Sequence, residues 1–130
     1  MKIDGSDHIL GRLSTSVVEA LKDGEDVEIY NADRVIVTGR PDDIIQKYRG
    51  KYERGSKEHG PKYPKAPDRM VRRTVRGMLP DSKQGRKMYE RLQVYTTEPG
   101  DDAVEFEEDK VKSLKGGNFL RMGAISENMG

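Results

Sequence analysis

The sequence predicts an α/β fold in which short strands alternate with helices around a largely parallel sheet. Residues 27–32 alternate apolar and polar side chains, and the run at 35–37 is β-branched and too short for a helix, so both segments favour strands. Residues 11–22 and 41–52 instead carry apolar side chains at helical spacing. With 130 residues and no visible internal repeat, we expect one domain over residues 1–130.

The first two elements follow from local signals. Within residues 1–7, Ile3 is the expected core contact of a short edge strand. A helix then begins at Gly11, and Asp23-Gly24 provides its C-terminal stop. The expected buried side of this helix comprises Leu13, Val17, Val18 and Leu21.

A second helix is expected to begin at Pro41, which suits a first helical position. Asp42 and Asp43 complement the helix dipole there. The apolar stripe of this helix continues through Ile44, Ile45, Tyr48 and Tyr52. Residues 53–66 then lose all periodicity and are rich in Gly, Pro and Lys, so we expect an extended loop that is ordered mainly by a partner.

Residues 67–80, with proline at both ends, predict a short amphipathic helix. Asp68 is the expected N-cap, because its carboxylate can accept hydrogen bonds from first-turn amides. One face carries Arg69, Arg72, Arg73 and Arg76, and the other carries Met70, Val71, Thr74, Val75 and Met78. Like charges at this spacing repel. The face is therefore either a solvated basic surface or the contact for an anion, and the planar guanidinium suits phosphate.

The C-terminal third is expected to add one helix and two strands. Ser82 can cap a helix that runs to about Arg91. On that helix we expect Met88 and Tyr89 to face inward and Lys83, Arg86 and Lys87 to face outward. Residues 92–97 alternate as a strand, and a last strand is expected around 119–121. The acidic, turn-rich residues 98–110 between them indicate a surface excursion.

Charge is strongly segregated along the chain. The 24 Lys and Arg nearly balance the 23 Asp and Glu, giving a net charge of +1. Residues 47–91, however, hold 15 basic and 5 acidic residues, a local charge of +10, whereas the remainder carries −9. Such a basic region is typical of a surface that binds a polyanion. No apolar run approaches the ~20 residues of a membrane span, and the N-terminus has no signal-peptide pattern, so we expect no membrane partner.

Enzymatic functions are poorly supported. The chain has no cysteine, no GxxxxGK[ST] loop and no GxGxxG after a strand. His8 and His59 lie in unrelated contexts, without carboxylates at metal-ligand spacing. We therefore expect no catalytic residue, metal, cofactor or small-molecule substrate. A nucleotide-binding enzyme that uses the strand-to-helix turn at Gly11 is the alternative.

Aromatic and basic residues are interleaved in the same region. Tyr48, Tyr52 and Tyr63 alternate with a set of cations. This set comprises Lys47, Arg49, Lys51, Arg54, Lys57, Lys62 and Lys65. Cations that grip a backbone beside rings that stack on unpaired bases are typical of nucleic-acid binding. Core packing is the alternative role for Tyr48 and Tyr52.

Several short motifs occur in a fixed order over positions 10–95. The most specific is Arg76-Gly77-Met78-Leu79-Pro80, which is followed by Gly85-Arg86 and Val94-Tyr95. Weaker ones are Leu10-Gly11-Arg12-Leu13, Asn31-Ala32, Val37-Thr38-Gly39, Lys47-Tyr48 and Tyr63-Pro64. Together they resemble the universal large-subunit ribosomal protein thirteen family, in its archaeal/eukaryotic form. The acidic segment 98–118 carries no matching motif.

This resemblance implies a three-layer α/β/α fold around a four-stranded, mainly parallel sheet, with a basic loop-and-helix extension. It also implies a structural constituent of the large ribosomal subunit, in the cytoplasm, which binds and stabilises large-subunit ribosomal RNA during assembly beside neighbouring ribosomal proteins. No catalytic activity is implied. An extra-ribosomal RNA-binding regulator of translation is the alternative.

The candidate RNA-binding residues combine the family motifs with the basic region. The motifs place Arg12, Lys47, Tyr48, Arg72, Arg73, Arg76, Gly77, Gly85 and Arg86 at or beside RNA. The charge pattern adds Arg49, Lys51, Arg54, Lys62, Tyr63, Lys65, Arg69, Lys83 and Lys87. Gly77 either allows close approach of another backbone, adopts a positive φ, or simply ends the helix.

Overall fold

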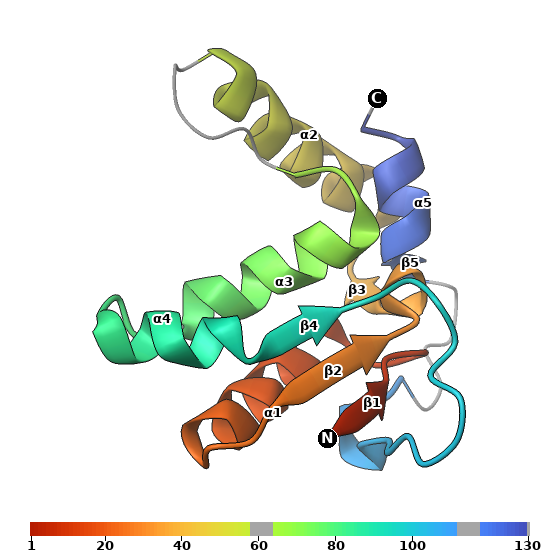
Figure 1. Ribbon diagram of the computed structural model, residues 1–130. Helices are drawn as coiled ribbons and strands as arrows, with labels where there is room; N and C mark the ends of the chain where they lie inside the picture. The colour runs from red at the N-terminus through yellow and green to blue at the C-terminus, as the bar shows by residue number, and fades with distance from the viewer. Residues whose placement is uncertain (58–63, 112–117, 130) are drawn as a thin grey trace.

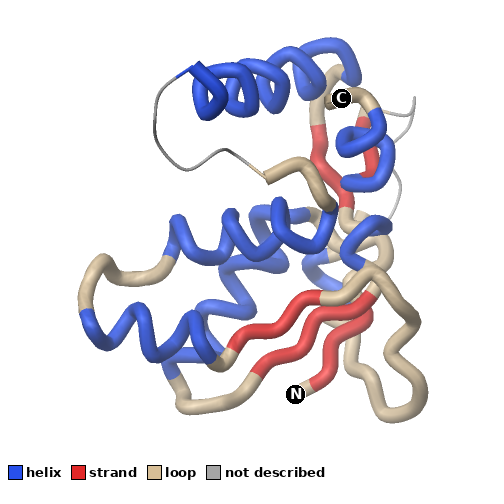
Figure 2. Tube along the Cα trace, turned by 45° about the horizontal axis from the view of Figure 1, so that its top comes forward, coloured by secondary structure: helices blue, strands red, loops and turns tan. Residues whose placement is uncertain are grey.

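The computed structural model describes residues 1–57, 64–111 and 118–129, with only the backbone described at 54–57. Its main sheet has three parallel strands in the order β1 (Lys2–Asp4), β2 (Val27–Tyr30) and β4 (Leu92–Val94). They lie side by side in Figures 1 and 2. This arrangement confirms the expected α/β class with a mainly parallel sheet.

Helices α1 (Leu10–Lys22), α3 (Pro67–Met78) and α4 (Lys83–Glu90) supply the packing against this sheet (Figure 1). Strand alternation sends every second side chain toward them. The inward positions Ile3, Val27, Ile29 and Leu92 are fully buried. They form one core with the apolar faces of α1 and α3.

The opposite face of the sheet is polar. Across the three strands, Lys2, Glu28 and Gln93 lie in one row, and Asp4 and Tyr30 lie in the next. All five are exposed or half-exposed. Parallel sheets covered on both faces have nearly continuous apolar strands, whereas these strands alternate. The described residues place three strands in the parallel sheet, so the expected fourth strand is not confirmed, and the polar face does not support a third layer.

Two further strands form a separate antiparallel pair, visible above the main sheet in Figure 2. They are β3 (Ile36–Thr38) and β5 (Phe119–Arg121), so the β-branched run at 35–37 does not join the parallel sheet as the sequence suggested. Helices α2 (Pro41–Lys57) and α5 (Met122–Glu127) pack beside β5. The 3-10 turn η1 (Ala32–Arg34) connects β2 to β3.

The observed ends of the helices can be compared with the capping residues and boundaries that the sequence predicted. Ser82 accepts a hydrogen bond from the Gly85 amide at 3.3 Å, which confirms the expected cap of α4. Asp68 was expected to cap α3, but Ala66 occupies that position and Asp68 lies in the first turn. Pro67 at the first helical position provides the preset φ that starts this helix. Helix α2 continues to Lys57, so the predicted loop at 53–66 is wrong for residues 53–57.

The described part of the acidic segment, residues 98–111, is largely exposed at the surface and is attached to the body by hydrogen bonds. The Val104 amide donates to Lys2 O at 2.8 Å, and the Asp4 amide donates to Val104 O at 3.0 Å, which adds one parallel bridge beyond β1. In the 3-10 turn η2 (Glu107–Asp109), Asp109 is buried and accepts a 2.6 Å hydrogen bond from Ser16 Oγ. Residues 112–117 of the expected acidic segment lie outside the described residues.

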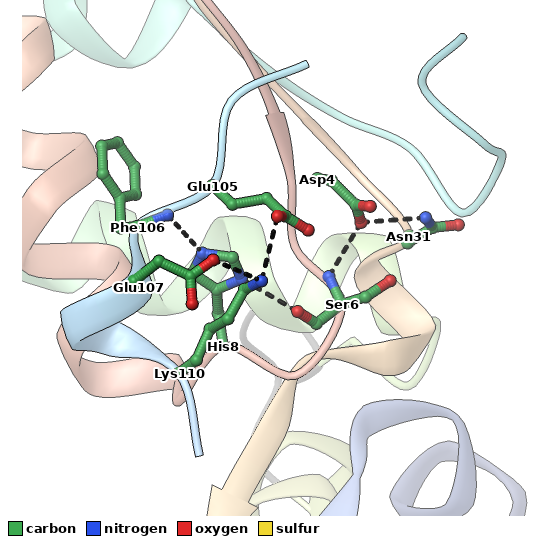
Figure 3. Close-up of polar contacts among 8 residues, drawn as sticks. All are labelled: Asp4, Ser6, His8, Asn31, Glu105, Phe106, Glu107 and Lys110. Atoms are coloured by element: carbon green, nitrogen blue, oxygen red, sulfur yellow. Dashed lines mark hydrogen bonds and ion pairs between the residues drawn. The ribbon is translucent and has the colours of Figure 1, made fainter. Parts of the chain in front are cut away.

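A buried histidine joins this segment to the start of the chain (Figure 3). The Phe106 amide donates to His8 Nε2 at 3.0 Å, so Nδ1 carries the proton and donates to Ser6 O at 3.0 Å. Nearby, the Lys110 ammonium contacts Glu105 at 3.0 Å and Glu107 at 3.1 Å. Burial lowers the pKa of Lys110, but these two hydrogen bonds outweigh burial and raise the pKa above its usual value. The two hydrogen bonds between the His8 ring and the backbone give His8 a structural role.

Asn31 and Asp4 form the second polar connection in Figure 3. Asn31 adopts a left-handed φ of 56°, which asparagine tolerates better than most residues. Its Nδ2 donates to Asp4 Oδ1 at 3.0 Å and to Glu98 Oε2 at 3.2 Å, while the Ser6 amide also donates to Asp4 Oδ1 at 3.0 Å. Burial raises the pKa of Asp4, but the hydrogen bonds from Asn31 and Ser6 prevail and lower the pKa below 3.8.

We expect Asp4→Asn to reduce the free energy of unfolding at about pH 7 but to have a smaller effect at about pH 2. The folded-state pKa of Asp4 is below the ordinary value of 3.8, so its stabilisation is present above that value and is lost as the pH falls through the folded pKa. Urea denaturation of both proteins at the two pH values measures the difference. A difference that stays constant with pH would contradict this role.

Candidate nucleic-acid interface

Packing of α3 determines where its charges lie. Met70, Val71 and Val75 are fully buried, and α3 packs against α1, β4 and α5. A helix with this buried stripe must present its opposite face outward. Accordingly, Arg69, Arg73 and Arg76 are exposed, whereas Arg72 is half-buried.

The arginines of this face have no anionic partner among the described residues. The ion pairs that the structure does contain lie elsewhere: Arg34 pairs with Glu98 at 3.2 Å, and Arg121 pairs with Asp7 at 2.9 Å. In residues 1–57, 64–111 and 118–129, no ion pair reaches the four arginines of α3 or Arg86. Their mutual repulsion is therefore not offset by any ion pair within the described residues.

A groove of about 380 Å³ lies between α3 and α4 and collects residues from both helices. It is lined by Arg73, Arg76, Gly77, Leu79, Pro80, Asp81, Ser82, Gly85, Arg86 and Tyr89. Three arginines thus line one concave surface, and Asp81 is the acidic residue in its lining. The most specific sequence motifs, Arg76–Pro80 and Gly85-Arg86, both contribute to this groove.

The two glycines of the groove have different structural roles. Gly77 lies inside α3, its φ is not positive, and a Cβ at this position would have no neighbour within 4 Å. A positive φ at Gly77 is therefore wrong, whereas its place next to the last residue of α3 agrees with a helix-end role, and its open surface leaves close approach as the prediction. Gly85, in contrast, is buried, and a Cβ there would lie 1.7 Å from Pro80 O. Gly85 thus has a packing role.

A second basic groove of about 290 Å³ lies between α2 and the start of α1. Lys47 and Lys51 line it together with Gly11, Thr38 and apolar residues. The Tyr48 ring is buried, and the Lys51 ammonium lies 5.2 Å from its centroid. The side chain of Tyr48 therefore packs in the core instead of being available for base stacking.

The other predicted site residues are dispersed. Arg12 Nη1 donates to Glu108 O at 3.4 Å, and Arg49 Nε donates to Asn128 O at 2.8 Å, so both are partly used within the chain. The Lys65 ammonium lies 5.6 Å from the ring centroid of Tyr52. Lys83 and Lys87 are exposed on α4. The side chain of Arg54 and the whole of Lys62 and Tyr63 lie outside the described residues.

Sequence reasoning missed Tyr89 as a site residue. The expected inward side of Tyr89 is confirmed, because its half-buried side chain packs against the core, but Tyr89 also lines the groove and contacts arginines of α3. The available signal was an aromatic residue three positions after Arg86, on the helix that follows the arginine-rich one. That signal has meaning only once the two helices are placed side by side.

An α/β body that presents uncompensated guanidiniums in a groove has the character of a polyanion-binding protein. Comparison with known proteins gives the particular family. Residues 1–101 match the family model described as Ribosomal protein L13. The chain is 41% identical over 129 residues to the large ribosomal subunit protein uL13 of Natronomonas pharaonis, covering 98% of this chain and 89% of the relative.

Other archaeal relatives agree. The large ribosomal subunit protein uL13 of Archaeoglobus fulgidus is 41% identical over 134 residues, covering 98% of this chain and 86% of the relative. That of Thermoplasma acidophilum is 34% identical over 135 residues, covering 98% and 96%. The chain therefore belongs to the ribosomal protein L13 family, a family of structural components and not of enzymes. No helix in the described part of the chain is long and apolar enough to cross a membrane.

We expect Gly85→Ala to lower the free energy of unfolding by about 1–3 kcal/mol, because the new Cβ must displace the Pro80 backbone. Gly50→Ala is the matched control, since Gly50 is also helical and a Cβ there meets nothing within 4 Å. The control should gain about 0.5–1 kcal/mol from helix propensity. Urea denaturation measures both changes, and equal stability of the two variants would refute the packing role of Gly85.

Proposed function

We propose that this chain binds and stabilises large-subunit ribosomal RNA during assembly of the large ribosomal subunit, in the cytoplasm and beside neighbouring ribosomal proteins. Its relatives are named as large ribosomal subunit proteins. The single observation that carries the proposal is the groove between α3 and α4, where Arg73, Arg76 and Arg86 converge without an ion-pair partner among the described residues.

The proposed mechanism is neutralisation of RNA phosphates by a rigid surface. Guanidiniums form charge-assisted, bidentate hydrogen bonds to phosphate, and such contacts fix orientation without reading base sequence. Because α3 is packed into the core, its cations are positioned before RNA arrives. A single folded domain would in this way hold RNA segments in register through residues 47–91.

The alternative, an extra-ribosomal regulator of translation, would use the same surface. No observation on the described residues favours it. Co-sedimentation distinguishes the two: the proposed constituent remains with large subunits after a high-salt wash, whereas a regulator is released.

We expect RNA affinity to fall steeply with salt, with a log–log slope of about −3.5 to −4.5 for on the order of five phosphate contacts. Arg73→Ala should weaken binding to a large-subunit ribosomal RNA fragment and make the slope shallower by about 0.7–0.9. Its melting temperature should barely change, because Arg73 is exposed and forms no ion pair among the described residues. Fluorescence anisotropy at several salt concentrations measures both the affinity and the slope.

Lys22→Ala is the matched control, since Lys22 is an exposed cation of α1 outside residues 47–91. It should leave the affinity and slope close to those of the unchanged protein. If Arg73→Ala unfolds the protein while affinity per folded molecule is intact, Arg73 is structural. If Arg73→Ala and Lys22→Ala weaken RNA binding equally, RNA responds to the overall charge of the protein and not to the α3–α4 groove, and the proposal is wrong.

A further inference from the structure

Tyr89 of α4 lies against two arginines of α3. The Arg72 Cζ is 4.4 Å from the centroid of the Tyr89 ring, and the Arg76 Cζ is 5.9 Å from the same centroid. Both distances are within the range of a cation–π interaction. Arg72 and Arg76 are one helical turn apart, so one ring contacts two neighbouring guanidiniums of the basic face.

The Tyr89 ring contacts two positively charged guanidiniums that lie close to each other, and neither has an anionic partner among the described residues. No carboxylate pairs with Arg72 or Arg76 among the described residues. Arg72 is half-buried, and its Nε is buried without a hydrogen-bond partner. Attraction to the ring face offsets part of the repulsion and limits the rotamers of both side chains. A guanidinium that stacks on a ring keeps its in-plane N–H groups free for an acceptor.

The groove supplies a place for that acceptor. Arg76 and Tyr89 both line it, together with Arg73 and Arg86 from its two sides, whereas Arg72 is not among its lining residues and adjoins it through the shared Tyr89 ring. Gly77 leaves the adjacent surface of α3 open, since a Cβ there would meet nothing within 4 Å. An acceptor with several anionic oxygens would match this set of donors, and a phosphodiester has that chemistry.

We propose that Tyr89 is a positioning residue that, with Arg72 on the same ring, holds the guanidinium of Arg76 in the groove for one phosphodiester group of RNA. This inference rests on the proposed function and adds the ligand group and the residue that orients its donors. Preorganisation raises affinity by reducing the side-chain entropy lost on binding. The cations themselves are unchanged, so Tyr89 should affect affinity much more than the salt slope.

Replacement of the ring tests this directly. Tyr89→Leu should weaken binding to the ribosomal RNA fragment by about fivefold and leave the salt slope nearly unchanged. Tyr89→Phe, which keeps the ring face, should bind within about twofold of the unchanged protein. Met88→Leu is the control for general changes in α4, because Met88 is the half-buried neighbour of Tyr89. Circular dichroism verifies folding, and Tyr89→Met replaces Tyr89→Leu if the latter is unfolded.

A double-mutant cycle with Arg76→Ala then shows whether Tyr89 acts through Arg76. We expect the loss in Tyr89→Leu to disappear largely in the Arg76→Ala background. Additive losses, or equal weakening by Tyr89→Phe and Tyr89→Leu, would overturn the positioning role. If Arg73→Ala weakens binding but Tyr89→Leu does not, only this inference fails. If neither variant weakens binding, the proposed function fails with it.

Discussion

Burial of Met70, Val71 and Val75 is the constraint on which the arrangement of this molecule depends. These side chains are fully buried where α3 meets α1 and β4. Each contributes on the order of 1.5–3 kcal/mol when removed from water. A helix whose opposite face carries four like charges needs such packing, since those charges oppose the free helix. The same burial fixes the direction in which the guanidiniums point, so folding the core also builds the basic surface.

Sheet order keeps the two kinds of charge apart. The basic helices α3 and α4 contact β4, at one edge of the three-stranded sheet. The acidic residues around Val104 continue beyond β1, at the other edge, as Figure 1 shows. His8, Asn31 and Ser16 hold that acidic segment in place through hydrogen bonds. The segregation seen in the sequence thus becomes a spatial separation that keeps the carboxylates of the acidic segment away from the α3–α4 groove.

Features that depend on near neighbours could be predicted from the sequence, and those that depend on distant pairing could not. The buried stripe of α3 and the Ser82 cap are local, and both are confirmed, except that Met78, expected on the apolar face, is exposed. The pairing of β3 with β5 and the packing of the acidic segment join residues about 80–100 positions apart, which no local pattern specifies. In the site, the charges were evident, but the stacking of Arg72 on Tyr89 required the relative placement of two helices.

The most direct test of this account is a structure of the assembled large ribosomal subunit that contains this chain. We expect the guanidiniums of Arg73, Arg76 and Arg86 to lie within hydrogen-bond distance of ribosomal RNA phosphates in the α3–α4 groove. A particle in which these three side chains face bulk solvent, while RNA contacts the polar face of the sheet, would contradict the central claim.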